Sequence, residues 1–279
     1  MDVEVLSGVG AEITGVEVTN LTAVEFTDIQ KVFAQQGLVF FRDQSLDEKQ
    51  HIEFAQLWGA INVNRFFAPH EKYPQIAMVT KEPDQKQNIG GSWHTDHSYD
   101  TEPALGSILV AREVPKRGGD TWFTNMYKAF EALSPGLQET LLGLNAVHSA
   151  HLAFGTNSAY KEVTDDRVGN AEVADALEDV VHPAVITHPL SGRKALYVNP
   201  GFTRRFDGWS TEDSLPVLKH LYAVAGNEAF ITKFRWRPGS IAFWDNRATW
   251  HSAQNDYQGD RRVMHRITIE GCALEAGAS

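Results

Sequence analysis

The sequence of 279 residues is poor in cysteine and in basic residues. Its one thiol, Cys272, excludes an internal disulfide and any zinc site built on two or more thiolates, and it has no evident role. Only 25 lysines and arginines stand against 36 acidic residues, for a net charge of -11. This balance argues against nucleic acid as a partner, although a few arginines inside a pocket could still bind a small anion.

Long apolar runs are also missing. No uninterrupted apolar stretch is long enough to cross a membrane, so no membrane partner is expected. The first residues, Met1 to Leu6, lack the basic and then apolar pattern of a signal peptide. Together with the single cysteine, these absences predict a cytoplasmic protein.

Nothing in the sequence divides the chain. It has no repeat, no low-complexity tract and no Pro/Gly/Ser linker, so we expect one domain over residues 1–279. Short apolar runs with Gly/Pro turns predict many short strands. These are Leu38–Phe41, Ile76–Thr80, Leu105–Ala111, Thr121–Phe123, Ala184–Thr187, Ala195–Val198, Phe230–Trp236, Ser240–Trp244 and Val263–Glu270. The pattern predicts a mostly β fold with flanking helices, in the form of a double-sheet jelly roll.

Helix signals occur between these strands. Thr22 and Glu25 form a possible capping box before a helix that Gly37 ends, and Ser45 with Glu48 repeats the pattern. Further helices are predicted at Met126–Leu133, Pro135–Leu142 and Asp213–Ala225.

A short segment, Ser92 to Tyr99, offers metal ligands. If it is extended, His94 and Asp96 point to the same side and can meet at one ion. His251, at the end of an apolar strand and a polar turn, is a candidate third ligand. Two histidines and one carboxylate leave coordination positions open, as in non-haem Fe(II) oxygenases. Taken alone, His94 and Asp96 are also explained by a structural hydrogen bond, and His251 by a core histidine.

Eleven residues after His251 lies a strand with two arginines on one face. Alternation places Arg262 and Arg266 together and His265 on the other face. Two cations on one face repel each other unless an anion lies beside them. This pattern favours an anion-binding pocket near the candidate metal.

These pieces, in this order, resemble the taurine dioxygenase / 2,4-dichlorophenoxyacetate dioxygenase family of Fe(II)/2-oxoglutarate-dependent enzymes. The resemblance covers nearly the whole chain. It is carried by Gly10–Val16, Trp93–Asp96, Gly118–Thr121, Trp244–Arg247 and the unit from His251 to Arg262. It implies a double-stranded β-helix (jelly-roll) fold, with Fe(II) as cofactor and 2-oxoglutarate and O2 as co-substrates. His94, Asp96 and His251 match the iron ligands.

The resemblance also implies binding roles for five other residues. Arg262 and Thr121 match the arginine and the hydroxyl that hold the distal carboxylate of 2-oxoglutarate. Arg266, His70 and Tyr73 match substrate contacts. All of them except Arg262 have a plainer alternative: an ion pair for Arg266, an ordinary strand threonine for Thr121, and exposed loop positions for His70 and Tyr73.

One departure concerns the residue four positions before His94. The taurine enzyme has an asparagine there, whereas this chain has Gly90. The change puts taurine in doubt as the substrate and suggests a roomier pocket. Phe154, Phe202 and Trp236 could line that pocket or fill the core.

The predicted activity is hydroxylation of a small organic substrate, with succinate and CO2 as products and cleavage of a carbon–heteroatom bond as a possible outcome. The favoured substrate is an anion: a sulfonate, a sulfate ester or a carboxylate. The alternatives are a zinc-dependent hydrolase, which would leave Arg262 and Thr121 without a purpose, and a non-catalytic binding barrel. The family resemblance also predicts a homo-oligomer, a dimer or tetramer.

Overall fold

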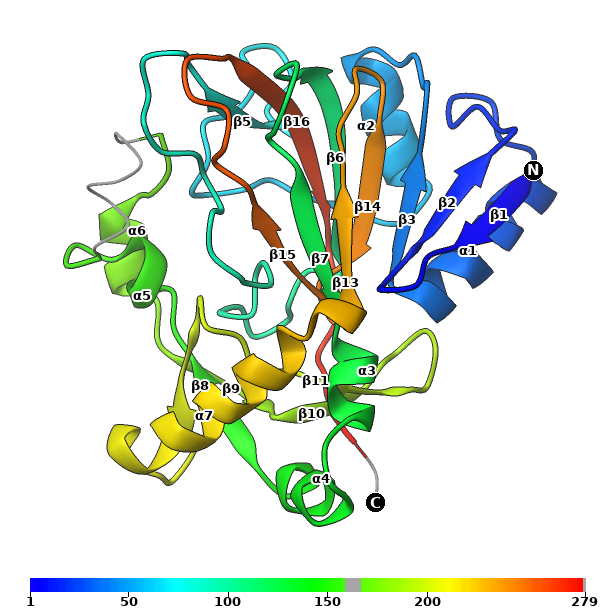
Figure 1. Cartoon of the computed structure of the whole chain (residues 1–279). Helices are drawn as coiled ribbons and strands as arrows, with labels where there is room; N and C mark the ends of the chain where they lie inside the picture. Colours follow the sequence, from blue (N-terminus) through cyan, green and yellow to red (C-terminus); the bar gives the residue numbers. More distant parts are fainter. Residues whose placement is uncertain (159–166, 278–279) are drawn as a thin grey trace.

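Strands dominate the structure, a computed structural model that describes residues 1–158 and 167–277 (Figure 1). The largest sheet has eight strands, which are antiparallel except that β2 runs parallel to β3. Its order is β1 (Asp2–Val5), β2 (Ala11–Thr14), β3 (Leu38–Phe41), β14 (Ile241–Asp245), β6 (Gly106–Glu113), β16 (Arg262–Ile269) and β4 (Ile61–Asn62), and β5 (Ala77–Lys81) also pairs with β16.

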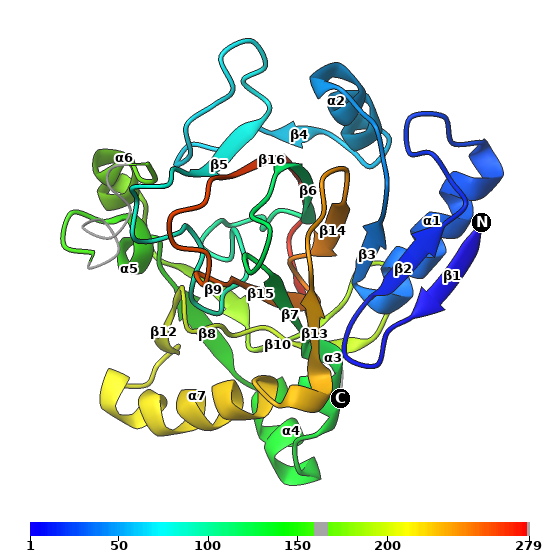
Figure 2. The same cartoon turned by 45° about the horizontal axis from the view of Figure 1, so that its top comes forward.

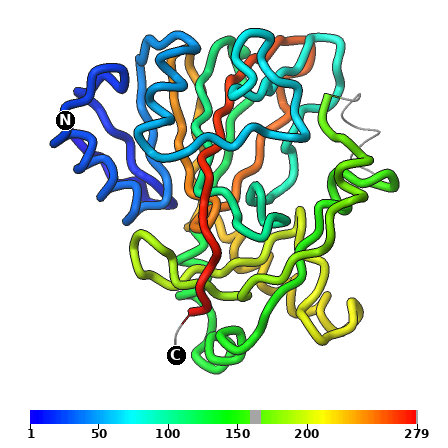
Figure 3. Tube along the Cα trace, turned by 180° about the vertical axis from the view of Figure 1, so that it is seen from behind, coloured from blue at the N-terminus to red at the C-terminus, as the bar shows by residue number. Residues whose placement is uncertain are grey.

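Three smaller sheets have three strands each. The first, β13 (Ile231–Phe234), β7 (Thr121–Asn125) and β15 (Thr249–Ala253), lies opposite β6 and β16 in Figure 2. The second contains β12 (Thr203–Phe206), β8 (Asn145–His148) and β9 (Val180–Pro183). The third contains β11 (Lys194–Leu196), β10 (Val185–Thr187) and β17 (Glu275–Ala276), and Figure 3 shows the C-terminal segment running down to it from β16.

Alternation of side chains gives the largest sheet two different apolar faces. On one face Ile108 and Phe243 pack against Phe33 of helix α1 (Ala23–Gln36), and the Phe33 and Phe243 rings stack with centroids 4.2 Å apart. On the other face Trp244 and Met264 belong to the cluster that includes Phe123 of β7. The candidate site lies between this second face and the sheet β13–β7–β15.

Helices cover the outside of these sheets. They are α1 (Ala23–Gln36), α2 (Glu48–Gln56), α3 (Met126–Glu131), α4 (Pro135–Leu142), α5 (His151–Phe154), α6 (Ala171–Ala176), α7 (Thr211–Ala225) and the 3-10 turn η1 (Glu228–Phe230). In Figure 1, α1 and α2 lie on the N-terminal side, and α4 and α7 at the opposite end of the molecule from α2. Among the described residues, no helix is both long and apolar enough to cross a membrane.

The start of α1 is confirmed and the start of α2 is corrected. Thr22 caps α1 with Glu25 in a reciprocal capping box, and Gly37 ends it at a φ of 69°. Helix α2 begins two residues later than the Ser45 pattern predicts. Its cap is Asp47, which accepts from the backbone N–H of Gln50. Ser45 and Asp47 both have a side-chain oxygen that can cap a helix, so the sequence alone does not decide between them.

The predicted strands are all present, and none of their ends shifts by more than two residues. Several short strands were not predicted, among them β8, β9, β12 and β15. Each has only four or five residues, which is too few for a clear alternation pattern. The result is a sheet-rich fold with several helices, as expected.

Candidate metal centre and active site

His94, Asp96 and His251 converge as predicted. Each offers one ligand atom, and these atoms lie within 4.8 Å of one another. Asp96 Oδ1 is 3.6 Å from His94 Nε2, and Asp96 Oδ2 is 3.7 Å from His251 Nε2. Two ligands about 2.1 Å from a shared ion lie roughly 3–3.5 Å apart, so an ion fits here with only small side-chain movements.

A local β-bridge brings the two histidines together. His94 N donates to His251 O at 3.1 Å, and His251 N donates to His94 O at 2.8 Å. Because they face each other across this bridge, their ring centroids are 4.2 Å apart. His251 lies in the middle of β15, which pairs with β7.

Asp96 reaches the same point by a different geometry from the one predicted. The chain is extended only up to His94 and then turns, and His97 has a left-handed φ of 61°. His97 lies outside the ligand cluster, as expected, although it is in a turn and not on a strand. Its Nδ1 bonds the carboxylate of Asp100 at 2.8 Å, which supports the turn.

The hydrogen bond of His94 prepares it to bind a metal. Its Nδ1 lies 2.7 Å from the carbonyl oxygen of Ser92, which can only accept, so Nδ1 carries the proton. The lone pair of Nε2 is therefore free on the side of Asp96. Such a bond on the outer ring nitrogen is the usual way that a metal-binding histidine is oriented.

Asp96 is buried and is held in its ionised form. Burial by itself would raise the pKa of this carboxyl, but Arg266 and the two histidines outweigh burial and hold the pKa well below its usual value. Arg266 Nη1 donates to Asp96 Oδ2 at 3.2 Å. Burial, with His94 beside it, lowers the pKa of His251 to about 3, so this ring is neutral, as a metal ligand must be.

A small cavity of about 50 Å³ contains the predicted anion-binding groups. It brings Arg262, Arg266 and Thr121 together with His94 and His251. Nε and Nη2 of Arg262 are buried and have no hydrogen-bond partner within the protein. A buried guanidinium with free N–H groups is costly unless an anion pairs with it. Iron, together with a carboxylate-bearing co-substrate at Arg262, therefore fits the residues that are present.

Thr121 is oriented to donate into the same cavity. Its Oγ1 accepts a hydrogen bond from Trp236 Nε1 at 2.9 Å. The hydroxyl hydrogen thus remains available for an acceptor beside Arg262. The guanidinium carbon of Arg262 also lies 5.8 Å from the centre of the Trp236 ring. The sequence left open whether Trp236 lines the pocket or fills the core. In the structure it is buried and supports both Thr121 and Arg262.

A larger cavity of about 470 Å³ adjoins the first at His94 and is mainly apolar. Phe154 and Phe202, for which the sequence left a pocket or a core role open, line this cavity. Phe67 lines both cavities, and Arg266 lies over its ring at 4.2 Å. Sequence reasoning missed Phe67 because it lies in a loop without periodicity. Other apolar residues around this cavity are Ile89, Leu152, Ala153, Val168 and Pro200.

Gly90 borders both cavities. Its φ is 78°, and a Cβ at this position would lie 3.3 Å from Cε1 of His94. A side chain here would therefore be strained and would press on the candidate ligand. The departure noted at this position leaves space next to His94, in line with a roomier pocket.

His70 and Tyr73 do not line either cavity. They border a separate surface depression with Glu48 and Met78. His70 lies close to His265, with ring centroids 5.5 Å apart, and the alternation of β16 places His265 on the face opposite Arg266. In this structure their position does not bring them to the candidate substrate pocket. No sequence signal marked which loop residues turn inward.

Comparisons with known proteins agree with this geometry. A family profile described as taurine catabolism dioxygenase TauD, TfdA family, matches residues 2–268. An alpha-ketoglutarate-dependent dioxygenase of Penicillium expansum is 31% identical, over 93% of this chain and 74% of its own length. An alpha-ketoglutarate-dependent sulfate ester dioxygenase of Pseudomonas putida is 31% identical, over 97% of this chain and 90% of its own length. The crystal structure of a taurine dioxygenase from Burkholderia xenovorans is 31% identical and has a TM-score of 0.81, over 98% of this chain and 92% of that one.

Proposed function

Because the chain belongs to the TauD/TfdA family of 2-oxoglutarate-dependent dioxygenases, we propose that His94, Asp96 and His251 hold its ferrous ion and that Arg262 and Thr121 bind its 2-oxoglutarate. The observation that carries the proposal is the meeting of three ligand atoms with a buried, unpaired guanidinium in one cavity. A zinc hydrolase would have no use for that guanidinium. When bound, Fe(II) and 2-oxoglutarate supply O2 activation, and the substrate is oxidised as the keto acid is converted to succinate and CO2.

The residues of the chain divide the work by position. Arg262 presents a fork of N–H donors to the distal carboxylate of 2-oxoglutarate, and the Thr121 hydroxyl donates to the same group. Arg266 keeps Asp96 ionised and limits its rotation. Phe67, Phe154 and Phe202 exclude water from the space beside His94.

The substrate that we propose is a small organic anion with an apolar body. The larger cavity is lined mostly by apolar side chains, and Arg266 lies next to Phe67 at its junction with the smaller one. Nε of Arg266 is buried without a partner in the protein and can donate to a sulfonate, sulfate ester or carboxylate. Hydroxylation next to the heteroatom of a sulfate ester or an ether would lead to cleavage of that bond.

We propose three further features of the whole protein. The facing of the largest sheet and the sheet β13–β7–β15 supports a double-stranded β-helix, or jelly roll. The extent of the family match supports one domain over residues 1–279. A cytoplasmic location and assembly into a homo-dimer or tetramer remain predictions. Sedimentation of the purified protein tests the oligomeric state.

Succinate release tests the function. Purified protein with Fe(II), 2-oxoglutarate and O2 should release succinate when given alkyl sulfates, sulfonates or aryloxy acids, and His94→Ala should abolish release. The exposed His220 provides a matched control, because His220→Gln removes a histidine that lines neither cavity of the candidate site. Full succinate release by His94→Ala would remove His94 from the ligand set. Under anaerobic conditions, Fe(II) with 2-oxoglutarate should also give a weak visible absorption band in the wild type.

A further inference from the structure

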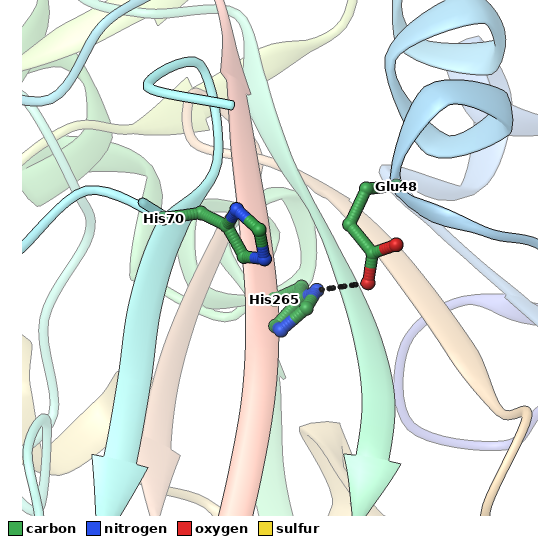
Figure 4. Close-up of side chains that lie close together, drawn as sticks. All are labelled: Glu48, His70 and His265. Atoms are coloured by element: carbon green, nitrogen blue, oxygen red, sulfur yellow. Dashed lines mark ion pairs between the residues drawn. The ribbon is translucent and has the colours of Figure 1, made fainter. Parts of the chain in front are cut away.

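A second cluster of metal-binding side chains lies on the outer face of β16. Glu48, His70 and His265 each offer one ligand atom, and these atoms lie within 4.8 Å of one another (Figure 4). Glu48 Oε1 is 3.6 Å from His265 Nδ1, and Figure 4 shows a ring nitrogen of His70 turned toward both. The only other cluster of this kind among the described residues is the candidate iron site.

The three side chains come from segments that are far apart in the sequence. Glu48 is the first residue of α2, His70 lies in the loop before β5, and His265 is in the middle of β16. The backbone places two of them firmly: His70 N donates to Ile76 O at 2.8 Å, and His265 pairs with Val110 and Met78 on the neighbouring strands. Two anchored histidines and a carboxylate at the start of a helix need little movement to close on an ion.

We propose that Glu48, His70 and His265 form a second site for a divalent transition-metal ion, separate from the iron site. Two imidazoles and one carboxylate suit ions such as Zn²⁺ or Co²⁺, and the surface depression beside them admits water as a further ligand. Nδ1 of His265 accepts a hydrogen bond from Arg112 Nε, so this nitrogen carries the lone pair that a metal ion needs. The 3.6 Å between Glu48 and His265 is close to the roughly 3.4 Å expected for two ligands of one tetrahedral ion.

Arg112 is the competitor of the ion. Its Nε donates to His265 Nδ1 at 3.1 Å, and its Nη2 is 3.8 Å from Glu48 Oε1. An ion bound at His265 Nδ1 takes over the lone pair that Arg112 uses, while Arg112 keeps its bond to the carbonyl oxygen of Leu46. His70 loses a bond as well. The backbone N–H of Lys72 donates to His70 Nδ1 at 3.2 Å. A neutral imidazole has only one nitrogen with a free lone pair, so a ring that gives this lone pair to an ion can no longer accept from Lys72. The site therefore ties α2, the loop at His70 and β16 together only at the expense of these two bonds.

Co²⁺ binding distinguishes the two sites. Metal-depleted wild type should bind two equivalents in equilibrium dialysis, and the double variant His94→Ala/His251→Ala should still bind one, with visible absorption bands and a higher melting temperature. Adding His70→Gln or Glu48→Gln to this double variant should weaken the remaining site by about tenfold or more. Adding Arg112→Met, which removes the competing charge and keeps most of the side-chain volume, should tighten it.

His220→Gln, added to the same double variant, is the matched control and should change nothing, because His220 is an exposed histidine of α7. His70 lies in a loop, so His70→Gln leaves the strand β16 intact. A loss of Co²⁺ binding in this variant then reports the loss of a ligand and not a folding defect. The proposal is overturned if the double variant binds less than half an equivalent of Co²⁺. It is equally overturned if His70→Gln and His220→Gln weaken the remaining site alike. These measurements use no turnover, so they fail or succeed independently of the proposed enzymatic function.

Discussion

Replacement of Arg262 by methionine should weaken co-substrate binding and stabilise the free protein. Two of its nitrogens, Nε and Nη2, are buried without a partner, and burial lowers the pKa of its guanidinium. Each hydrogen bond between charged partners contributes about 1.5–3 kcal/mol, so the loss of two should cost about 3 kcal/mol or more. That corresponds to about a hundredfold increase in the Kd of 2-oxoglutarate or beyond, since about 1.4 kcal/mol is a factor of ten.

The effect on stability has the opposite sign. In the free protein the unpaired nitrogens cost about 1–3 kcal/mol of desolvation, and methionine removes that cost while it fills similar space. The free energy of unfolding in urea, without co-substrate, should therefore rise by about this amount. A residue that merely supported the fold would change both quantities in the unfavourable direction.

The assay is an anaerobic titration of the Fe(II) protein with 2-oxoglutarate, followed by visible absorption, next to a urea titration of the metal-free protein. Arg261→Met is the matched control. Arg261 is half-exposed and pairs with Glu82 and Glu113 on the surface, so the Kd should stay unchanged. An unchanged Kd in Arg262→Met, or equal effects in the two variants, would refute the assigned role.

Of three shorter predictions, two concern the candidate site and one concerns the buried ion pair of Asp245 and Arg247. Gly90→Ala should lower succinate release and cost about 1 kcal/mol of stability, because a Cβ there meets His94 at a positive φ; a urea titration and a rate assay check both. Arg266→Met should raise the KM for an anionic substrate much more than that for 2-oxoglutarate, and equal increases would contradict a substrate contact. Asp245→Asn should destabilise the fold by about 3–5 kcal/mol, because it leaves the buried guanidinium of Arg247 without its anion; a loss below about 1 kcal/mol in urea would contradict this pairing.

Much of the candidate site could be predicted from the sequence because its chemistry depends on residue type and on strand alternation. His94, Asp96 and His251 offered the ligand set, and the alternation along β16 correctly separated Arg262 and Arg266 from His265. These inferences concern identity and local period, and both are properties of the chain itself. The capping box of α1 is of the same kind.

Other predictions failed or were missing because they depend on contacts between distant segments. The cap of α2 was placed at Ser45 when Asp47 serves, since both residues offer the same type of acceptor. His70 and Tyr73 were assigned to the substrate pocket, whereas the loop before β5 carries them to the outer face of β16. Phe67, from the same loop, faces the cavity instead.

By itself, then, the order of residue types predicted a strand-rich chain, a candidate donor set for one metal ion and a strand with two arginines on one face. Only the tertiary structure decided which loop side chains enter the cavity, that Arg262 is buried without a partner, and that Glu48 meets His70 and His265. The reason is physical: periodicity reports which way a side chain points from its own strand, whereas burial and convergence arise from how separate segments pack against one another.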